Sequence, residues 1–259
     1  MTIESRLNEV LDVLLSDYRT PVASEQLIHC IDLTLLDEAA TEKSLAQLNR
    51  DALINQVAAV CVYSKHLSQF QHLNPVQLAT VINFPQGDEA LITSLESIEK
   101  AAREGATEID YVLSYHMYLN DKRHEALEQC IAIIERCKKK NLILKIILET
   151  GAFTEPQDIY ELSFSLAQAG CNFLKTSTGK IAQGASLPAV FVMLSAIKDS
   201  GTICGVKISG GIKTPKQASD YAQLAELMMG KKIDKSWFRI GASSLLSELQ
   251  KEVKLHCDQ

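Results

Sequence analysis

The sequence predicts an α/β protein whose fold is a closed (β/α)8 TIM barrel, in a single domain with an additional N-terminal helix. Short apolar runs recur about every 20 to 35 residues, and helix-like segments fill the intervals. Runs such as residues 142–148 are nearly continuous in apolar character, which is typical of parallel strands covered by helices on both faces. Eight such βα units in 259 residues fit one closed barrel.

A doubly wound open sheet is the alternative arrangement of the same elements. That fold normally has a glycine-rich first βα turn, and the sequence contains no Gly-x-Gly-x-x-Gly motif. No Gly/Ser-rich linker, Pro-rich linker or low-complexity tract interrupts the pattern. We therefore expect residues 1–259 to form one barrel domain.

The N-terminal segment differs from the repeating units. Its apolar side chains follow helical spacing, so residues 1–25 are expected to form a helical extension outside the barrel. These side chains are Leu7, Val10, Leu11, Leu14 and Leu15.

The repeating units follow in order. The expected strands begin near Ile28, Val57, Leu78, Glu108, Leu142, Cys171, Thr202 and Trp237. The expected helices between them include residues 42–53, 89–104, 122–140, 157–169, 187–199 and 216–229.

Composition excludes several classes of protein. The chain has 26 Lys and Arg against 32 Asp and Glu, a net charge of −6, so neither nucleic acid nor an anionic membrane is an expected partner. No apolar run approaches the roughly 18 residues that span a bilayer, and the first residues lack the basic segment of a secretory signal. Seven cysteines without a Cys-x-x-Cys pair favour reduced thiols and a cytoplasmic location.

Three lysines in otherwise apolar strands are the most informative feature. A lone strand lysine is more often a snorkelling or edge side chain, but Lys145, Lys175 and Lys207 lie on three successive predicted strands. At matching heights they would point into one small cavity. A Schiff-base lysine needs a neutral amine, which a second cation favours, and a carboxylate such as Asp110 can move the protons. The pattern indicates imine chemistry.

Glycines and hydroxyls follow the last three strands, at residues 176–180, 209–211 and 241–244. Backbone amides freed by glycine, with serine hydroxyls at a helix N-terminus, can bind an anion. A glycine pair alone is more often a plain turn. The loops after strands seven and eight of such barrels frequently bind a substrate phosphate, so two of these loops together favour a phosphate site.

The segment NFLKTSTGK at residues 172–180 resembles the signature around the Schiff-base lysine of the deoxyribose-phosphate aldolase family. Further similar segments occur in the family's order and extend the resemblance from about residue 28 to 246. They are DLT at 32–34, TVINFP at 80–85, EID at 108–110, LKIILETG at 144–151, GVK at 205–207, GG at 210–211 and RIGASS at 239–244.

The resemblance implies a class I lyase that needs neither metal nor cofactor. It would cleave 2-deoxy-D-ribose 5-phosphate reversibly to D-glyceraldehyde 3-phosphate and acetaldehyde, a step of deoxyribonucleotide catabolism. Lys175 would form the imine, and Lys207 would keep it deprotonated. Asp110 would be the acid/base residue, with Lys145 as its hydrogen-bonded partner.

The resemblance also implies the substrate contacts. The residues that match the family's phosphate contacts are Gly179, Lys180, Gly210, Gly211, Ser243 and Ser244, and Lys213 stands where some members have arginine. Asp32, Thr34, Asn83, Thr178 and Gly241 complete the expected substrate-binding set. Some members end in a tyrosine that helps to protonate the enamine carbon, whereas the last tyrosine here is Tyr221. The proton donor is therefore left open.

Two alternatives remain at this point. One is another Schiff-base lyase acting on a different phosphorylated aldol, and the other is a catalytically silent barrel that binds a sugar phosphate. The histidines show no metal-ligand spacing, which weighs against a zinc-dependent aldolase. A homodimer or a homotetramer is compatible with such a barrel.

Overall fold

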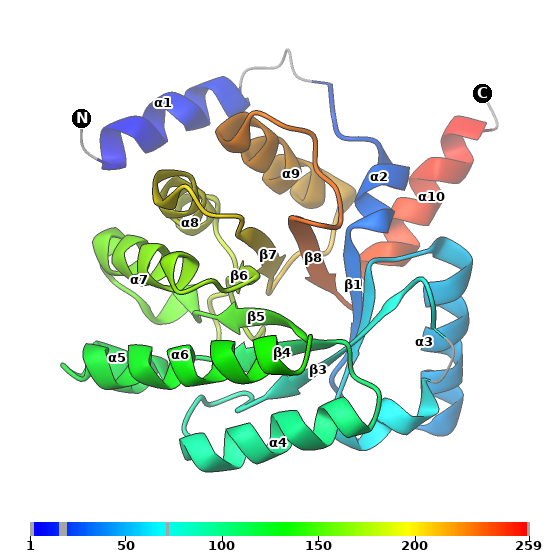
Figure 1. The fold of residues 1–259 in the computed structure, drawn as a ribbon. Helices are drawn as coiled ribbons and strands as arrows, with labels where there is room; N and C mark the ends of the chain where they lie inside the picture. Colours follow the sequence, from blue (N-terminus) through cyan, green and yellow to red (C-terminus); the bar gives the residue numbers. More distant parts are fainter. Residues whose placement is uncertain (1–2, 16–19, 71–72, 258–259) are drawn as a thin grey trace.

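Eight parallel strands close into a barrel in the order β1 to β8, and β8 pairs with β1 (Figure 1). The computed structural model describes residues 3–15, 20–70 and 73–257. The strands are β1 Ile31–Leu35, β2 Ala59–Val62, β3 Gln77–Ile82, β4 Glu108–Val112, β5 Ile143–Ile147, β6 Phe173–Lys175, β7 Gly205–Ser209 and β8 Phe238–Ala242. The predicted barrel is confirmed, and the open sheet is excluded because β1 and β8 pair with each other.

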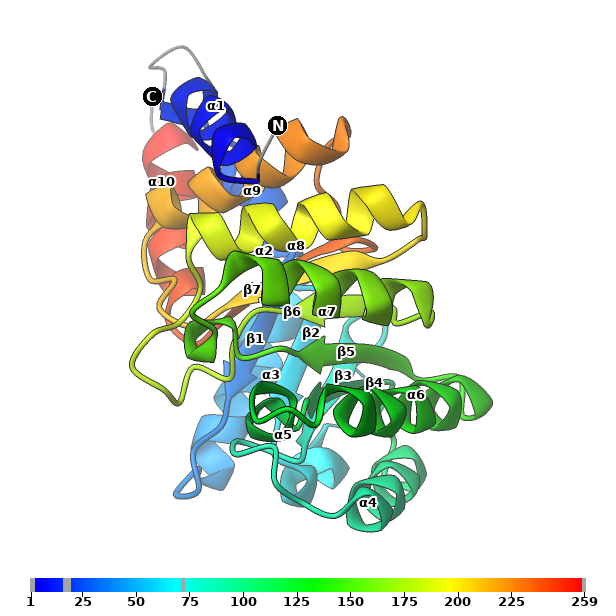
Figure 2. The same cartoon turned by 90° about the vertical axis from the view of Figure 1, so that its left-hand side faces the viewer.

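Helices surround this sheet and cover its outer face (Figure 1, Figure 2). They are α2 Ser24–His29, α3 Glu42–Asn55, α4 Leu91–Arg103, α5 Tyr115–Leu119, α6 Arg123–Lys139, α7 Pro156–Gln168, α8 Leu187–Ser200, α9 Pro215–Met229 and α10 Leu245–Cys257, with 3-10 turns η1 Ser64–Gln69 and η2 Thr150–Ala152. The six helices expected from periodicity all form, with ends within two residues of the expected positions. The sequence interpretation missed α2, α5 and both 3-10 turns, and it gave no bounds for α10, the helix of the eighth βα unit.

Local capping residues explain where several helices begin and end. Thr41 and Thr214 each form a capping box with the side chain of the third helical residue. α9 also has proline at its first position, where the missing N–H has no intrahelical partner in any case. It ends at Gly230, whose φ of 66° suits glycine in a C-cap.

The N-terminal extension is two helices and not one. α1, Ile3–Leu15, packs outside the barrel against α8 and α9 (Figure 1, Figure 2). Residues 20–23 are not helical, and α2 then begins at Ser24. Pro21 explains the interruption, because proline lacks an N–H and disfavours a helical conformation in the residue before it. Residues 1–2 and 16–19 of the expected extension lie outside the described residues.

The interior of the barrel is divided between apolar and charged side chains. Cys61, Ala79 and Val81, from β2 and β3, form a small apolar cluster with Tyr63 and Phe84 packed against it. The main core lies between the sheet and the helices. Charged side chains occupy the interior where β4 to β8 and β1 face one another. Across residues 3–15, 20–70 and 73–257, no helix is long and apolar enough to cross a membrane.

Candidate active site

The strand register sets the heights of the three interior lysines. Lys175 pairs directly with Lys207 across β6 and β7. Lys145 pairs with Phe173, two residues before Lys175, so it lies one inward-facing layer deeper. The expectation that all three lysines lie at matching heights is therefore wrong for Lys145. The cause is the stagger of strands in a tilted barrel.

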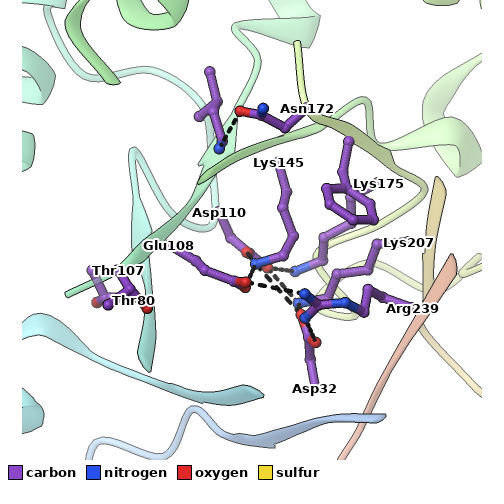
Figure 3. A network of polar contacts seen from close by, with 12 residues as sticks. Asp32, Thr80, Thr107, Glu108, Asp110, Lys145, Asn172, Lys175, Lys207 and Arg239 are labelled. Atoms are coloured by element: carbon purple, nitrogen blue, oxygen red, sulfur yellow. Dashed lines mark hydrogen bonds and ion pairs between the residues drawn. The ribbon is translucent and has the colours of Figure 1, made fainter. Parts of the chain in front are cut away.

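Asp110, in the middle of β4, is the centre on which the lysines converge (Figure 3). Its Oδ1 accepts a hydrogen bond from Lys145 Nζ at 3.0 Å. Its Oδ2 accepts one from Lys175 Nζ and one from Lys207 Nζ, each at 2.7 Å. Lys145, Lys207 and Asp110 are fully buried, and Lys175 is nearly so. The structure thus brings together the four side chains that the sequence singled out.

A second layer of charge lies beneath Asp110; the sequence had assigned Asp32 to substrate binding and had given Glu108 and Arg239 no role. Arg239 donates to Asp32 Oδ1 at 2.7 Å and to Glu108 Oε1 at 3.1 Å. Asp32 Oδ2 also lies 2.6 Å from Lys207 Nζ, and Lys145 forms an ion pair with Glu108. Glu108 could have been identified from the sequence. It lies two positions before Asp110 on a buried strand, and side chains two positions apart on a strand face the same side.

The charges of this network balance when one amine is neutral. Its carboxylates are Asp32, Glu108 and Asp110, and its cationic groups are Lys145, Lys175, Lys207 and Arg239. With every group ionised, the four cations exceed the three carboxylates by one. A net charge in a buried site is costly, so the arrangement favours the loss of one proton.

The pKa directions indicate which amine loses that proton. Burial lowers the pKa of Lys175, the Lys207 ammonium lowers it further, and the Asp110 carboxylate opposes both. Burial also acts to lower the pKa of Lys207, but Asp110 and Asp32 outweigh it and raise that pKa. The neighbouring ammonium groups hold the pKa of Asp110 well below its ordinary value despite its burial. Lys175 is therefore the amine most easily made neutral.

A cavity of about 240 Å³ opens above this network at the carboxyl ends of the strands. Of the seven network residues, Lys175 alone lines it. The other lining residues come from the carboxyl ends of β1, β7 and β8 and from the loops after β1, β6, β7 and β8. They are Thr34, Leu36, Thr178, Gly179, Lys180, Ser209, Gly210, Gly211, Ile212, Lys213, Gly241, Ala242, Ser243 and Ser244.

Glycine shapes the wall formed by the loops after β6 and β7. Gly210 and Gly211 have φ values of 90° and 88°, a region that side chains other than glycine rarely adopt. A Cβ on Gly184 would stand 2.3 Å from the carbonyl oxygen of Gly210. These two loops can therefore approach each other only as glycine backbone, which closes this side of the cavity.

Ten of the twelve predicted substrate-binding residues line the cavity, and Asp32 and Asn83 do not. Asp32 is fully buried in the charged network. Asn83 donates to the carbonyl oxygen of Val112 at 2.9 Å and accepts from the Glu89 N–H at 2.7 Å. Both side chains thus bind other parts of the protein: Asp32 lies on β1 beneath the cavity, and Asn83 holds the turn that directly follows β3.

No group of three or more His, Cys, Asp or Glu side chains within the described ranges is placed to hold a metal ion. The expectation of a reaction without metal or cofactor rests on the sequence resemblance. What the site offers chemically is an amine of lowered pKa at the base of the cavity, in contact with a carboxylate that a second amine shares.

Comparisons with known proteins agree with this geometry. A model of the DeoC/LacD family aldolases matches residues 26–251. The chain is 35% identical over 234 residues to a deoxyribose-phosphate aldolase of Agrobacterium fabrum, which covers 88% of this chain and 90% of the relative.

Solved structures show the same similarity. The tetrameric deoxyribose phosphate aldolase of Aeropyrum pernix aligns with a TM-score of 0.75 and 27% identity, over 98% of this chain and 100% of that one. A structure from Coccidioides immitis aligns with a TM-score of 0.78 and 26% identity, over 98% of both chains.

Proposed function

Because the chain belongs to the DeoC/LacD aldolase family, we infer that it is a deoxyribose-phosphate aldolase. The protein is a lyase that cleaves 2-deoxy-D-ribose 5-phosphate to D-glyceraldehyde 3-phosphate and acetaldehyde. The observation that carries the residue assignment is the place of Lys175: it is the network amine on the cavity wall, in contact with Asp110 and level with Lys207.

In the proposed mechanism, the neutral amine of Lys175 adds to the aldehyde carbon of the open-chain sugar. The resulting carbinolamine loses water and becomes an iminium ion. Asp110 lies 2.7 Å from Lys175 Nζ, where a carboxylate can take up and return protons during these steps. The C3 hydroxyl then loses its proton, its oxygen becomes the carbonyl oxygen of glyceraldehyde 3-phosphate, and the bond between C2 and C3 breaks. The iminium ion accepts the electrons of that bond and becomes an enamine.

Lys207 and Lys145 serve this chemistry through Asp110. Both ammonium groups donate to the carboxylate and keep it ionised. The positive charge of Lys207 also disfavours protonation of the neighbouring Lys175, so the reactive amine loses its proton at a lower pH.

Replacing Lys207 by leucine is expected to move the acidic limb of the pH profile of kcat/KM upward by about one pH unit or more. The ammonium that lowers the pKa of Lys175 is then absent. Asp110 also no longer pairs with Lys207, so its carboxylate interacts more strongly with the Lys175 ammonium. Both changes raise the pKa of Lys175. The pH profile of kcat/KM is measured in a coupled assay, with the coupling enzyme in excess at every pH. Lys207→Arg retains the charge and serves as control. An unmoved limb in Lys207→Leu would remove Lys207 from this role.

The phosphate of the substrate is proposed to bind between the loops after β6, β7 and β8. Lys180 and Lys213 supply positive charge at this end of the cavity, and Ser243 and Ser244 lie on its wall just before α10 begins. The N-terminus of a helix favours an anion because its first N–H groups have no intrahelical partner.

Ser243→Ala is expected to raise KM for the phosphorylated sugar about tenfold and to leave kcat nearly unchanged, because a hydrogen bond to a charged group is lost. The KM for 2-deoxyribose without the phosphate should not change. Ser236→Ala, which changes an exposed serine before β8 that does not line the cavity, is the matched control. Equal effects on both sugars would place the phosphate elsewhere.

Reductive trapping tests the proposed function directly. The protein is incubated with acetaldehyde, reduced with borohydride and digested, and an ethyl adduct is sought by mass spectrometry. An adduct on Lys175 supports both the imine and the donor aldehyde. A folded protein without that adduct would favour a different carbonyl substrate or a sugar-phosphate-binding barrel without catalysis.

We also propose a cytoplasmic location and a homodimer or homotetramer. Six buried cysteines are unpaired, which suits a reducing compartment. The Aeropyrum pernix relative is tetrameric, and exposed apolar side chains such as Ile54 and Ile92 are available for contacts between subunits.

A further inference from the structure

Glu149 is a buried carboxylate that the mechanism above does not use. The described residues contain four buried carboxylates, and Asp32, Glu108 and Asp110 each form ion pairs with cationic side chains. Glu149 is fully buried as well, yet it has no Lys, Arg or His within ion-pair distance in the described part of the chain. A buried carboxylate without a cation is costly in its ionised form, so the site favours a group that exchanges its proton.

The hydrogen-bond partner of Glu149 lies on the cavity wall. Thr178 N–H is 3.3 Å from each carboxylate oxygen of Glu149, and the Thr178 hydroxyl donates to Oε2 in a short hydrogen bond. Thr178 lines the substrate cavity together with Lys175. Its hydroxyl oxygen also accepts from the N–H of Lys180 at 3.1 Å. One hydroxyl therefore connects the buried carboxyl group to a residue of the cavity wall.

The backbone of Glu149 is held in an unusual conformation next to the reactive lysine. Its φ and ψ are 56° and 57°, in the left-handed region that non-glycine residues seldom adopt. Hydrogen bonds on both sides maintain it, from Leu148 N to Lys175 O at 2.9 Å and from Thr150 N to Thr176 O at 2.8 Å. These two hydrogen bonds fix the backbone of Glu149 beside the end of β6, and so they fix the direction in which its side chain leaves the backbone.

The surroundings of Glu149 raise its pKa above the ordinary value, and burial is the main cause. Burial raises its pKa, while the hydrogen bonds from Thr178 and the charge of Lys175 on β6 act in the opposite direction. Glu149 also acts on Tyr115, at the start of α5. Burial raises the pKa of Tyr115, and the charges of Glu149 and Asp88 raise it further. Asp110, in contrast, is held ionised by its ammonium neighbours.

We propose that Glu149 is a positioning residue that moves a proton to and from the cavity through the hydroxyl of Thr178. The step served is the protonation of the two-carbon fragment that remains on Lys175 after cleavage. This inference rests on the proposed function, because it assumes the enamine of a Schiff-base aldolase.

The transfer begins when Glu149 has taken up a proton and donates it toward the Thr178 oxygen. This reverses the resting hydrogen bond and frees the Thr178 hydroxyl proton for the cavity. The nucleophilic carbon of the neutral enamine takes the hydroxyl proton of Thr178, so a C–H bond forms and the O–H bond breaks. The carboxyl proton of Glu149 passes to the Thr178 oxygen and restores the hydroxyl. The products are an iminium cation on Lys175 and a Glu149 carboxylate, which recovers its proton from water. The reverse transfer removes the methyl proton of the acetaldehyde imine.

Exchange of the methyl hydrogens of acetaldehyde in D₂O isolates this step, because it requires imine formation, loss of a methyl proton and reprotonation of the enamine carbon, but no cleavage. In Glu149→Gln we expect the rate of deuterium uptake, followed by NMR, to fall at least about tenfold. Trapping of acetaldehyde on Lys175 by borohydride should remain as in the unmodified protein. Glu155→Gln changes an exposed carboxylate near the same loop and should leave deuterium uptake and borohydride trapping unchanged.

A second pair of variants keeps the test decisive if Glu149→Gln does not fold. Thr178→Val removes the hydroxyl at constant shape and should slow deuterium uptake as Glu149→Gln does, whereas Thr178→Ser should retain it. Uptake within twofold of the unmodified rate in Thr178→Val, or an equal loss of trapping and uptake, would overturn the relay. If the unmodified protein gave no adduct on Lys175, the proposed function itself would fail.

Discussion

Lys175→Ala is expected to abolish cleavage of 2-deoxy-D-ribose 5-phosphate, with a loss of roughly 10⁴-fold or more in kcat. The amine that forms the imine is removed, and the other two interior lysines lie beneath the cavity wall in ion pairs with buried carboxylates. Turnover is followed by coupling glyceraldehyde 3-phosphate to a dehydrogenase. The reductively trapped acetaldehyde adduct should disappear in the same variant.

The fold should survive this substitution. Asp110 retains the ammonium groups of Lys145 and Lys207, so the carboxylate is not left unpaired in the barrel. Lys216→Ala, which removes an exposed lysine of α9, is the control for activity and for thermal unfolding. Cleavage by a folded Lys175→Ala protein at more than a few per cent of the normal rate would refute the assignment of the imine.

Asp110→Asn is expected to lower both activity and stability. The amide keeps the shape of the side chain but not its charge, so three buried lysines lose a common partner. Removing one member of a buried ion pair costs about 3–5 kcal/mol of unfolding free energy, and loss of a general acid/base costs about 10²–10⁴ in rate. Asp220→Asn, which removes the partner of Lys216 on the surface, should cost less than about 1 kcal/mol.

The stability loss in Asp110→Asn should depend on pH in a defined direction. The pKa of Asp110 lies well below its ordinary value in the folded protein. A carboxyl group of this kind stabilises the fold above its unfolded pKa of about 3.9 and loses that contribution as the pH falls through the folded value. Urea unfolding should therefore show the full difference from the unmodified protein near neutral pH. A difference that did not shrink in acid would exclude the charge of Asp110 as its cause.

The sequence alone was sufficient to predict most of the barrel. Strands buried on both faces require apolar runs, and covering helices require one apolar face, so these two patterns leave a direct record in the sequence. The break between α1 and α2 was also available, because Pro21 disfavours a helix on its N-terminal side. Short elements such as α5 were missed, because one or two turns carry too little periodicity to distinguish them from a loop.

The sequence by itself indicated that Lys145, Lys175, Lys207 and Asp110 belong to one site, because charged residues on adjacent, otherwise apolar strands of a closed barrel are best accommodated by pairing in its interior. Tertiary structure decided the rest. Strand stagger placed Lys145 one layer below the other two lysines. Contacts between residues far apart in the sequence paired Arg239 with Asp32 and Glu108, and joined Glu149 to Thr178. Such pairs depend on side-chain directions across neighbouring strands, and no spacing along the chain records them.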